Sequence, residues 1–224
     1  MDQDVRTRQR LLETASKLFS QRGFNNVTVR EICAEARANV AAVNYHFGDK
    51  FGLYREVVRT AIDALRGTSA AAMEAGFGGS AEDKLRAYVR VFLQRVAANS
   101  QDSWIHRLMN HEVTDPTPAL DLIVEEAIRP RLEYLASVVA ELLDCPVSDD
   151  RVMMCVASVQ SQCLIAIRNA AADRLYPKLK LTPPTIHELA DHIAEFSLAG
   201  IRAIKAGRSA PASVRKGRRR STAS

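Results

Sequence analysis

The chain is poor in residues that interrupt helices: of its 224 residues, 10 are glycine and 8 are proline. Aromatic residues make up only 6%, and no stretch alternates apolar and polar residues with the period of two that a half-buried strand requires. Hydrophobic residues nevertheless make up 47%, enough to bury one substantial core, or a small and a larger one. We therefore predict an all-α globular fold.

Long hydrophobic runs are also missing. The longest uncharged run, Val152 to Ile167, has 16 residues and contains polar side chains, so the sequence predicts neither a secretion signal nor a membrane span. The cysteines show no C-x-x-C spacing and lie in apolar surroundings, at Cys33, Cys145, Cys155 and Cys163. We expect buried, reduced thiols in a cytoplasmic protein.

The sequence contains no constellation typical of an enzyme or a metal site. His106 and His111, like His187 and His192, are five residues apart, whereas two ligands on one helical face require a spacing of four. No order of Ser, Cys and His suggests a nucleophile with its base. We expect no catalytic activity, no metal and no cofactor.

Charge is distributed unevenly along the chain. Residues 1–67 carry a net charge of +3, residues 68–206 carry −4 and residues 207–224 carry +6, which together give +5. Two basic ends around an acidic middle indicate that the ends meet a polyanion. The basic end "RKGRRR" lies in a segment without apolar periodicity, which we expect to be disordered. A solvated tail, accessory DNA affinity, and contact with RNA or a membrane surface stay open for it.

Helical periodicity over residues 6–22 ends at Gly23. Thr28 and Glu31 then match a capping box, which begins a second helix with Val29 and Ile32 facing inward. The link "ARAN" leads to a third short helix, and two short helices joined by a turn of this length predict a helix-turn-helix.

The third helix, in "NVAAVNYHFGDK", is bounded by its own residues. Asn39 is its expected N-cap, Gly48 supplies a left-handed stop, and Asp49 can cap a fourth helix that runs to Gly67. Helical spacing places Val40, Val43 and Phe47 on an inward stripe. It places five residues outward or at the boundary: Ala41, Ala42, Asn44, Tyr45 and His46.

Residues 7–58, and especially "LFSQRGFNNVTVREICAEA" followed by "YHFGDKFGLY", resemble the DNA-binding domain of the TetR family of bacterial transcriptional regulators. The variant "NVAAVNYHFG" and the downstream "NHEVTDPTPALDLIVEEAIRPRLEYL" further resemble the CecR-like subgroup. The resemblance implies an N-terminal helix-turn-helix domain over 1–67, a ligand-sensing and dimerising helical domain over 68–206, and a basic tail over 207–224.

This resemblance assigns the third helix to the major groove of DNA. Small alanines bring a backbone near base edges, and Asn44 can donate to and accept from adenine. Arg30 is suited to guanine, and Thr28 at a helix N-terminus to a phosphate. Arg37 stands where the family often has glycine, so it is either strained, in a turn of different shape, or a phosphate contact. The candidate DNA contacts are Thr28, Arg30, Arg37, Asn39, Val40, Ala41, Ala42, Asn44, Tyr45, His46 and Lys50.

Beyond "GFGGS" at 76–80, amphipathic segments over 82–98, 102–112, 118–143, 150–172 and 185–206 predict a helical bundle. The family resemblance places dimerisation on the last two helices. Candidate interface residues are Ile186, Leu189, Ile193, Phe196 and Gly200. Isolated polar groups among apolar ones are typical of a small-molecule pocket, although each is also an ordinary core or surface residue. These candidates are Trp104, His106, Gln160, Gln162 and Asn169.

We therefore expect a homodimeric, cytoplasmic regulator that binds double-stranded operator DNA, and a repressor that a small-molecule effector releases from a palindromic operator. A transcriptional activator, and a constitutive DNA-binding protein without an inducer, stay open as alternatives.

Overall fold

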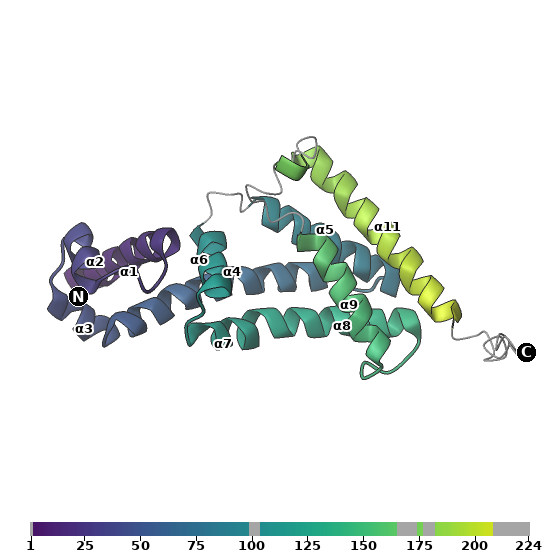
Figure 1. Ribbon diagram of the computed structural model, residues 1–224, viewed down its shortest axis with the longest axis horizontal. Helices are drawn as coiled ribbons and strands as arrows, with labels where there is room; N and C mark the ends of the chain where they lie inside the picture. Colours follow the sequence, from purple (N-terminus) through teal and green to yellow (C-terminus); the bar gives the residue numbers. More distant parts are fainter. Residues whose placement is uncertain (1, 99–103, 165–173, 177–181, 208–224) are drawn as a thin grey trace, which may run out of the picture.

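The computed structural model describes residues 2–98, 104–164, 174–176 and 182–207. The residues in these ranges form helices and turns but no strands, which confirms the predicted all-α class. The helices α1 (Asp2–Arg22), α2 (Val29–Ala36) and α3 (Val40–Phe47) gather at one end of an elongated molecule (Figure 1). The end of α11 lies at the opposite end.

The other helices follow the predicted segments with two differences. Their bounds are α4 (Lys50–Ala75), α5 (Ala81–Ala98), α6 (Trp104–Thr114), α7 (Ala119–Ile123), α8 (Arg129–Leu143), α9 (Asp150–Cys163) and α11 (Pro183–Gly207). The segment predicted over 118–143 contains a π-helical stretch, η1 (Val124–Ile128), between α7 and α8. Of the segment predicted over 150–172, residues 165–172 lie outside the described part.

The second difference concerns α4, which we expected to end at Gly67. Glycine within a helix costs about 1 kcal/mol relative to alanine, which weakens a helix without ending it. A Cβ atom at Gly67 would lie 3.3 Å from Nη1 of Arg95 on α5, so the missing side chain allows close approach of the two helices. The domain boundary predicted near residue 67 therefore falls inside a continuous helix.

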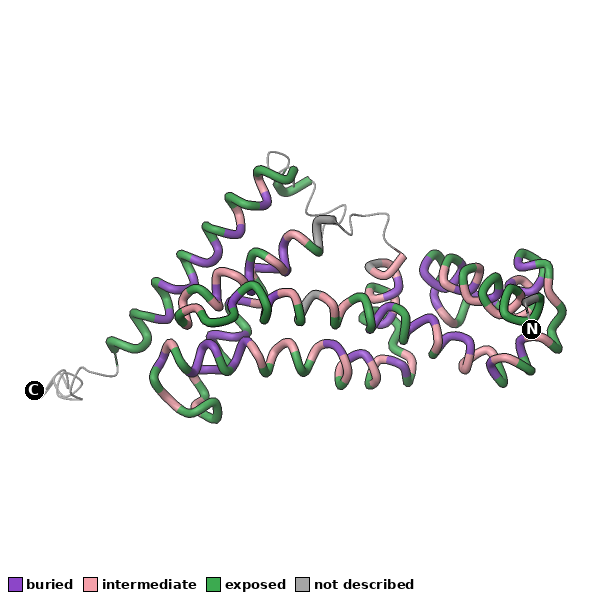
Figure 2. The backbone as a smooth tube through the Cα atoms, turned by 180° about the vertical axis from the view of Figure 1, so that it is seen from behind, coloured by how far each residue is buried: buried purple, intermediate pink, exposed green. Residues whose placement is uncertain are grey.

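Helix α4 takes part in two hydrophobic cores. Leu53 and Ile62 pack in a core with α1, α2 and α3, which also includes Leu108 of α6 and Ile123 of α7. Ala72, near the other end of α4, belongs to a second core built by α5, α8, α9 and α11. Figure 2 shows the buried stretches of these helices facing one another. We call residues 2–49 the head and residues 76–207 the body, which α4 connects.

A buried carboxylate joins the connecting helix α4 to the body. Glu112 on α6 is 1% exposed, and its carboxylate accepts a hydrogen bond from the hydroxyl of Tyr54 on α4. The backbone N–H and the hydroxyl of Thr117 donate to the same carboxylate at 3.1 and 2.9 Å. Burial and the adjacent Glu112 raise the pKa of Tyr54 above its usual range, so the phenol stays protonated and donates. A buried charge is tolerated when it is hydrogen-bonded in this way.

We expect Glu112→Ala to lower the free energy of unfolding by about 3 kcal/mol, because it leaves Tyr54 and the Thr117 N–H buried without an acceptor. Urea denaturation followed by circular dichroism measures the change. Asp115→Ala is the matched control: it removes an exposed carboxylate of the same region, with an expected change of about 0.5 kcal/mol or less. Equal losses for the two variants would contradict the assigned role of Glu112.

Candidate DNA-binding surface

The N-terminal ends of α2, α3 and α4 are capped by the side chains that the sequence predicts. Thr28 and Glu31 form the capping box: the hydroxyl oxygen of Thr28 accepts from the Glu31 N–H, and the Glu31 carboxylate accepts from the Thr28 N–H at 2.7 Å. Asn39 accepts from the Ala42 N–H at 2.8 Å, and Asp49 accepts from Gly52 at 2.7 Å. These short-range contacts fix the two-turn helix α3 at the surface of the head.

The exposed side of α3 presents unused hydrogen-bonding groups. Ala41, Asn44 and Tyr45 are exposed, and Tyr45 is 77% exposed. Within the described residues, the Asn44 amide and the Tyr45 hydroxyl make no hydrogen bond to the protein. Val43 and Phe47 are buried as predicted, but Val40 is 43% exposed, so its inward placement was wrong. Helical side chains tilt toward the N-terminus, and Val40 in the first turn projects past the core that covers the other two.

Three candidate contacts are turned partly inward. The His46 side chain is only 8% exposed, and its Nε2 lies 3.3 Å from the carboxylate of Asp4 on α1. Ala42 packs partly buried against the head core. The Lys50 ammonium lies 4.2 Å from the ring centroid of Phe24, and burial lowers its pKa. The prediction that His46 lies on the outward face is therefore wrong.

The sequence reasoning missed the start of α1, which covers this side of α3. Helix α1 begins at Asp2, four residues before the predicted start. Its Arg8 lies 5.3 Å from the ring centroid of Phe47 and pairs with Glu56 of α4 at 2.9 Å. Charged residues at helical spacing at the chain start were the available signal for this extension.

Positive charge remains unneutralised beside α3. Arg30 and Arg37 are exposed, and neither makes an ion pair with a described residue. The carboxylates of α2 are already occupied, in the pairs Arg22–Glu31 at 2.8 Å and Lys17–Glu35 at 2.7 Å. The two guanidinium groups can therefore bind phosphate or guanine.

Backbone geometry at Arg37 decides between the alternatives for that residue. Arg37 has φ 51° and ψ 49°, the left-handed conformation that glycine adopts without strain. The turn thus has the shape that suits glycine, and arginine is strained in it. Thr28 is exposed, but its hydroxyl donates to Glu31 at 2.7 Å, so its proton is used within the capping box. Asn39, two residues after Arg37 in the turn between α2 and α3, is also exposed.

The five candidate ligand residues do not form one pocket among the described residues. Trp104 lines a hollow of about 440 Å³ between α1, α4 and α6, together with Leu12 and Thr60. Gln160 accepts from the Tyr88 hydroxyl at 2.9 Å, and Gln162 donates to Ser197 at 3.2 Å, both in the body. Asn169 and the side chain of His106 lie outside the described part.

The candidate dimer residues divide between the core and the surface. Ile186 and Ile193 are buried in the body core of their own chain, and Leu189 packs against it, so these three serve packing within the chain. Phe196 is 64% exposed, and Gly200 is also exposed. The apolar stripe on α11 therefore faces inward, and only these last two residues lie at its exposed side.

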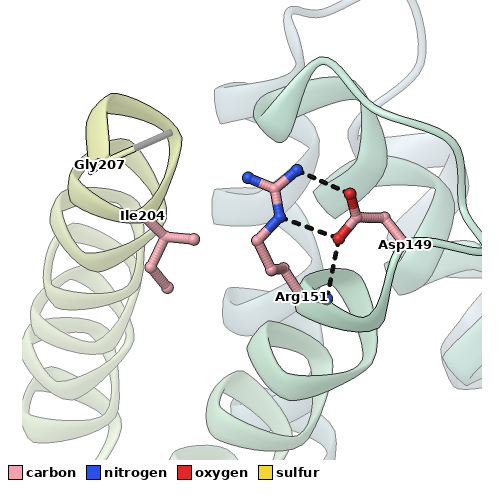
Figure 3. A pocket seen from close by; sticks show the side chains of 4 residues that line it. All are labelled: Asp149, Arg151, Ile204 and Gly207. Carbon is pink, nitrogen blue, oxygen red and sulfur yellow. Dashed lines mark hydrogen bonds and ion pairs between the residues drawn. The ribbon is translucent and has the colours of Figure 1, made fainter. Parts of the chain in front are cut away.

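A second hollow, of about 520 Å³, lies between the start of α9 and the end of α11 (Figure 3). Asp149, Arg151, Ile204 and Gly207 line it. The Arg151 guanidinium donates to Asp149 at 2.9 and 2.7 Å, so its charge is already paired. The described part contains no group of three metal-ligating side chains, and none of its helices has the length and hydropathy of a membrane span.

We expect Arg37→Gly to raise the free energy of unfolding by about 1 kcal/mol, because it relieves a left-handed conformation. The same variant should weaken DNA binding and lower the salt slope of log K by about one, because it removes one phosphate-binding charge. Asp144→Gly is the matched control, since Asp144 is also left-handed, with φ 54°, and follows the last residue of α8 in the body. It should stabilise the fold and leave DNA affinity unchanged; a loss of affinity in both variants would contradict a contact by Arg37.

The capping box should make stability depend on pH. The hydrogen bond from the Thr28 hydroxyl, followed by that from Arg22, lowers the pKa of Glu31 from 4.5 to about 2. A depressed folded-state pKa stabilises the protein above the unfolded value, and this stabilisation is lost as pH falls through the folded value. The stability difference between the wild type and Glu31→Gln should therefore stay constant above about pH 5 and shrink toward pH 2. Denaturation at successive pH values measures it, and a constant difference down to pH 2 would disprove the assignment.

Comparison with known proteins agrees with this geometry. Residues 11–57 match the family model of bacterial regulatory proteins of the tetR family, and residues 81–201 match that of the C-terminal domain of the HTH-type transcriptional dual regulator CecR. The chain is 29% identical over 157 residues to CecR of Shigella flexneri, which covers 66% of this chain and 69% of that protein. It is 26% identical over 141 residues to the probable acrEF/envCD operon repressor of Escherichia coli K12, which covers 62% and 61% of the two chains.

A solved structure shares the fold. AibR, crystallised with isovaleryl coenzyme A and operator DNA, matches with a TM-score of 0.61 at 16% identity, over 85% of this chain and 97% of that chain. The two family models together span the head and the body, and the second alone covers more than half of the chain. This chain belongs to the TetR family of DNA-binding transcriptional regulators, with a C-terminal domain of the CecR type.

Proposed function

We propose that this regulator is a cytoplasmic, homodimeric repressor that binds a two-fold symmetric operator and releases it when a small molecule binds the body. The observation that carries the proposal is the exposed face of α3, with Asn44 and Tyr45 unpaired and two free guanidinium groups nearby. A two-turn helix reads only a few base pairs, and a second copy doubles the site.

The surface of α9 and α11 supports pairing of two chains. These two helices pack against each other. Phe196 on α11 and Met153 and Met154 on α9 are all exposed. Large apolar side chains that face water mark interaction surfaces when they gather on neighbouring elements. The dimer contact is therefore assigned to the exposed sides of these helices, including Gly200, where no side chain hinders close approach.

Release of the operator by an effector requires a coupling free energy of ordinary size between the two binding events. A hundredfold loss of operator affinity corresponds to about 2.7 kcal/mol of preference of the effector for the state that does not bind DNA. AibR, whose structure holds isovaleryl coenzyme A together with operator DNA, supports the presence of a small-molecule site in a regulator of this fold. The relative named as an operon repressor supports repression as the outcome.

Activation is the second candidate, and the relative named a dual regulator favours it. The same bound dimer blocks RNA polymerase or assists it according to where the operator lies relative to the promoter. A reporter with the selected operator at its native position distinguishes the two: deletion of the regulator raises expression under repression and lowers it under activation.

Selection from random DNA should return a palindromic site. We expect Arg30→Ala to relax base preference at one position per half-site, with a loss of about 1–3 kcal/mol on the selected operator. Lys50→Ala should weaken all sequences alike and lower the salt slope by about one, because its charge acts on phosphate. Fluorescence anisotropy at several salt concentrations measures both effects.

Lys84→Ala is the matched control, because this body lysine is paired with Glu141 at 2.8 Å and should leave operator affinity unchanged. A selection without a palindrome would overturn the proposed mode of binding. Identical effects of Arg30→Ala and Lys50→Ala would overturn the separate roles assigned to these residues.

We expect Phe196→Glu to give a folded monomer with weakened operator binding, because a charge replaces an exposed apolar side chain at the proposed dimer contact. Light scattering measures the mass, and circular dichroism checks the fold. Phe77→Glu is the matched control, since Phe77 is 91% exposed on the loop after α4 and should leave the dimer intact. A Phe196→Glu variant that stays dimeric would place the interface elsewhere.

A further inference from the structure

Arg131, near the start of α8, is a cation for which the described chain supplies no anion. Its Nε atom is buried and has no hydrogen-bond partner. No carboxylate of the described residues forms an ion pair with its guanidinium. Its one close electrostatic contact is with an aromatic face, since Cζ lies 4.8 Å from the ring centroid of Phe92 on α5.

This arrangement differs from that of three arginines that join α5 and α11. Arg86, Arg90 and Arg202 each pair with a carboxylate on the other of these two helices. Removing a cation from water is unfavourable, and an aromatic face offsets only part of this. The folded chain thus holds a guanidinium group whose best hydrogen-bonding partner is missing from the protein itself.

The groups around Arg131 come from three helices of the body. Burial raises the pKa of Tyr88 on α5 and of Cys163 on α9 to about 12, and the positive charge of Arg131 acts against both shifts. Arg131 therefore lies within electrostatic range of both. The Tyr88 hydroxyl donates to Gln160, and the rings of Tyr88 and Phe92 are nearly parallel, with centroids 6.3 Å apart. A guanidinium, an amide and two aromatic rings meet at one place inside the body.

We propose that Arg131 anchors an anionic effector through the carboxylate of that effector. Guanidinium binds carboxylate through two parallel hydrogen bonds, which gives both affinity and orientation. This inference rests on the proposed ligand-released function and names the chemical class of the ligand. Gln160 orients the Tyr88 hydroxyl at the edge of the site.

The position of Arg131 also links such a site to the head. Arg131 follows η1 after two residues, and π-helical stretches inside helices are frequent at functional sites. Pro130 has no N–H to donate to the carbonyl of Glu126, four residues earlier. Arg66 of α4 donates to that carbonyl at 2.9 Å and pairs with the Glu126 carboxylate at 2.9 Å. An anion bound at Arg131 thus acts two residues from a segment that is fastened to α4.

The test compares acids with their uncharged amides on the full-length protein. The probes are hexanoate and benzoate, with hexanamide and benzamide, measured by ligand-observed NMR and calorimetry. Wild-type protein should bind each acid at least tenfold more tightly than its amide. Arg131→Met should abolish this preference, and Arg131→Lys should retain part of it, since lysine keeps the charge without the planar pair of donors.

Arg129→Met is the matched control, because Arg129 lies two residues away on the same helix and is exposed and paired with Glu125. It should keep the preference for acids. Arg131→Met should melt at the same temperature as the wild type or higher, since the variant removes a buried Nε without a hydrogen-bond partner and keeps an apolar side chain beside Phe92. Equal binding of acids and amides by the wild type, an acid preference that survives in Arg131→Met, or a lower melting temperature of that variant would each overturn the proposal.

Operator binding by anisotropy, measured in parallel, separates this inference from the proposed function. Acids that bind at Arg131 without changing operator affinity would support the site and contradict release by its ligand. An uncharged compound that releases the operator while neither acid is preferred over its amide would overturn the anionic site and leave the ligand-released repressor standing.

Discussion

The buried carboxylate of Glu112 is the contact that holds the connecting helix α4 to the body, and the position of the head depends on that helix. It receives Tyr54 from the connecting helix and Thr117 from the turn after α6, so three segments meet at one charge. The ring of the adjacent His111 lies close to Gly23. A Cβ atom at Gly23 would lie 3.1 Å from that ring, and φ of Gly23 is 78°. The positive φ favours glycine at this position, and the missing Cβ leaves room for the His111 ring between the end of α1 and α6.

Helix α4 carries this attachment into the body. Tyr54 near its start is bonded to Glu112, and Arg66, twelve residues later, is bonded to η1. At 1.5 Å per residue these two contacts are about 18 Å apart along one helix axis. Helix α4 therefore connects η1 to the head core through one continuous helix. Coupling through two packed elements with distinct arrangements is the physical form that allostery takes.

The sequence predicted best the features that depend on neighbours within four residues. The capping box of Thr28 and Glu31 and the caps at Asn39 and Asp49 form from the residues of each turn, so their spacing alone defines them. At Arg37 the sequence left open whether the turn has a positive φ, and the structure gives φ 51°.

Contacts between distant segments were not predictable in this way. His46 lies at an outward position of its own helix, yet the start of α1 covers it. Ile186 and Ile193 form an apolar stripe, and a stripe has the same pattern whether it packs within its chain or against a second copy. Glu112, in an otherwise polar "NHEVTD", gave no sign that its carboxylate is the one that is buried, because its partners Tyr54 and Thr117 are brought to it by the fold.

The turn between α2 and α3 carries both backbone strain and an unpaired positive charge, and both belong to Arg37. Arg37 adopts a left-handed conformation at a cost of about 1 kcal/mol. Among the described residues, no carboxylate pairs with its guanidinium. A guanidinium that neutralises a phosphate of DNA releases a counterion and strengthens binding at low salt, and the exposed side chain of Arg37 is suited to such a contact. Because the carboxylates of α2 are held by Arg22 and Lys17, they do not oppose this attraction. The exposed guanidinium groups of Arg30 and Arg37 therefore remain available to an anionic partner, which is the charge pattern that binding to DNA requires.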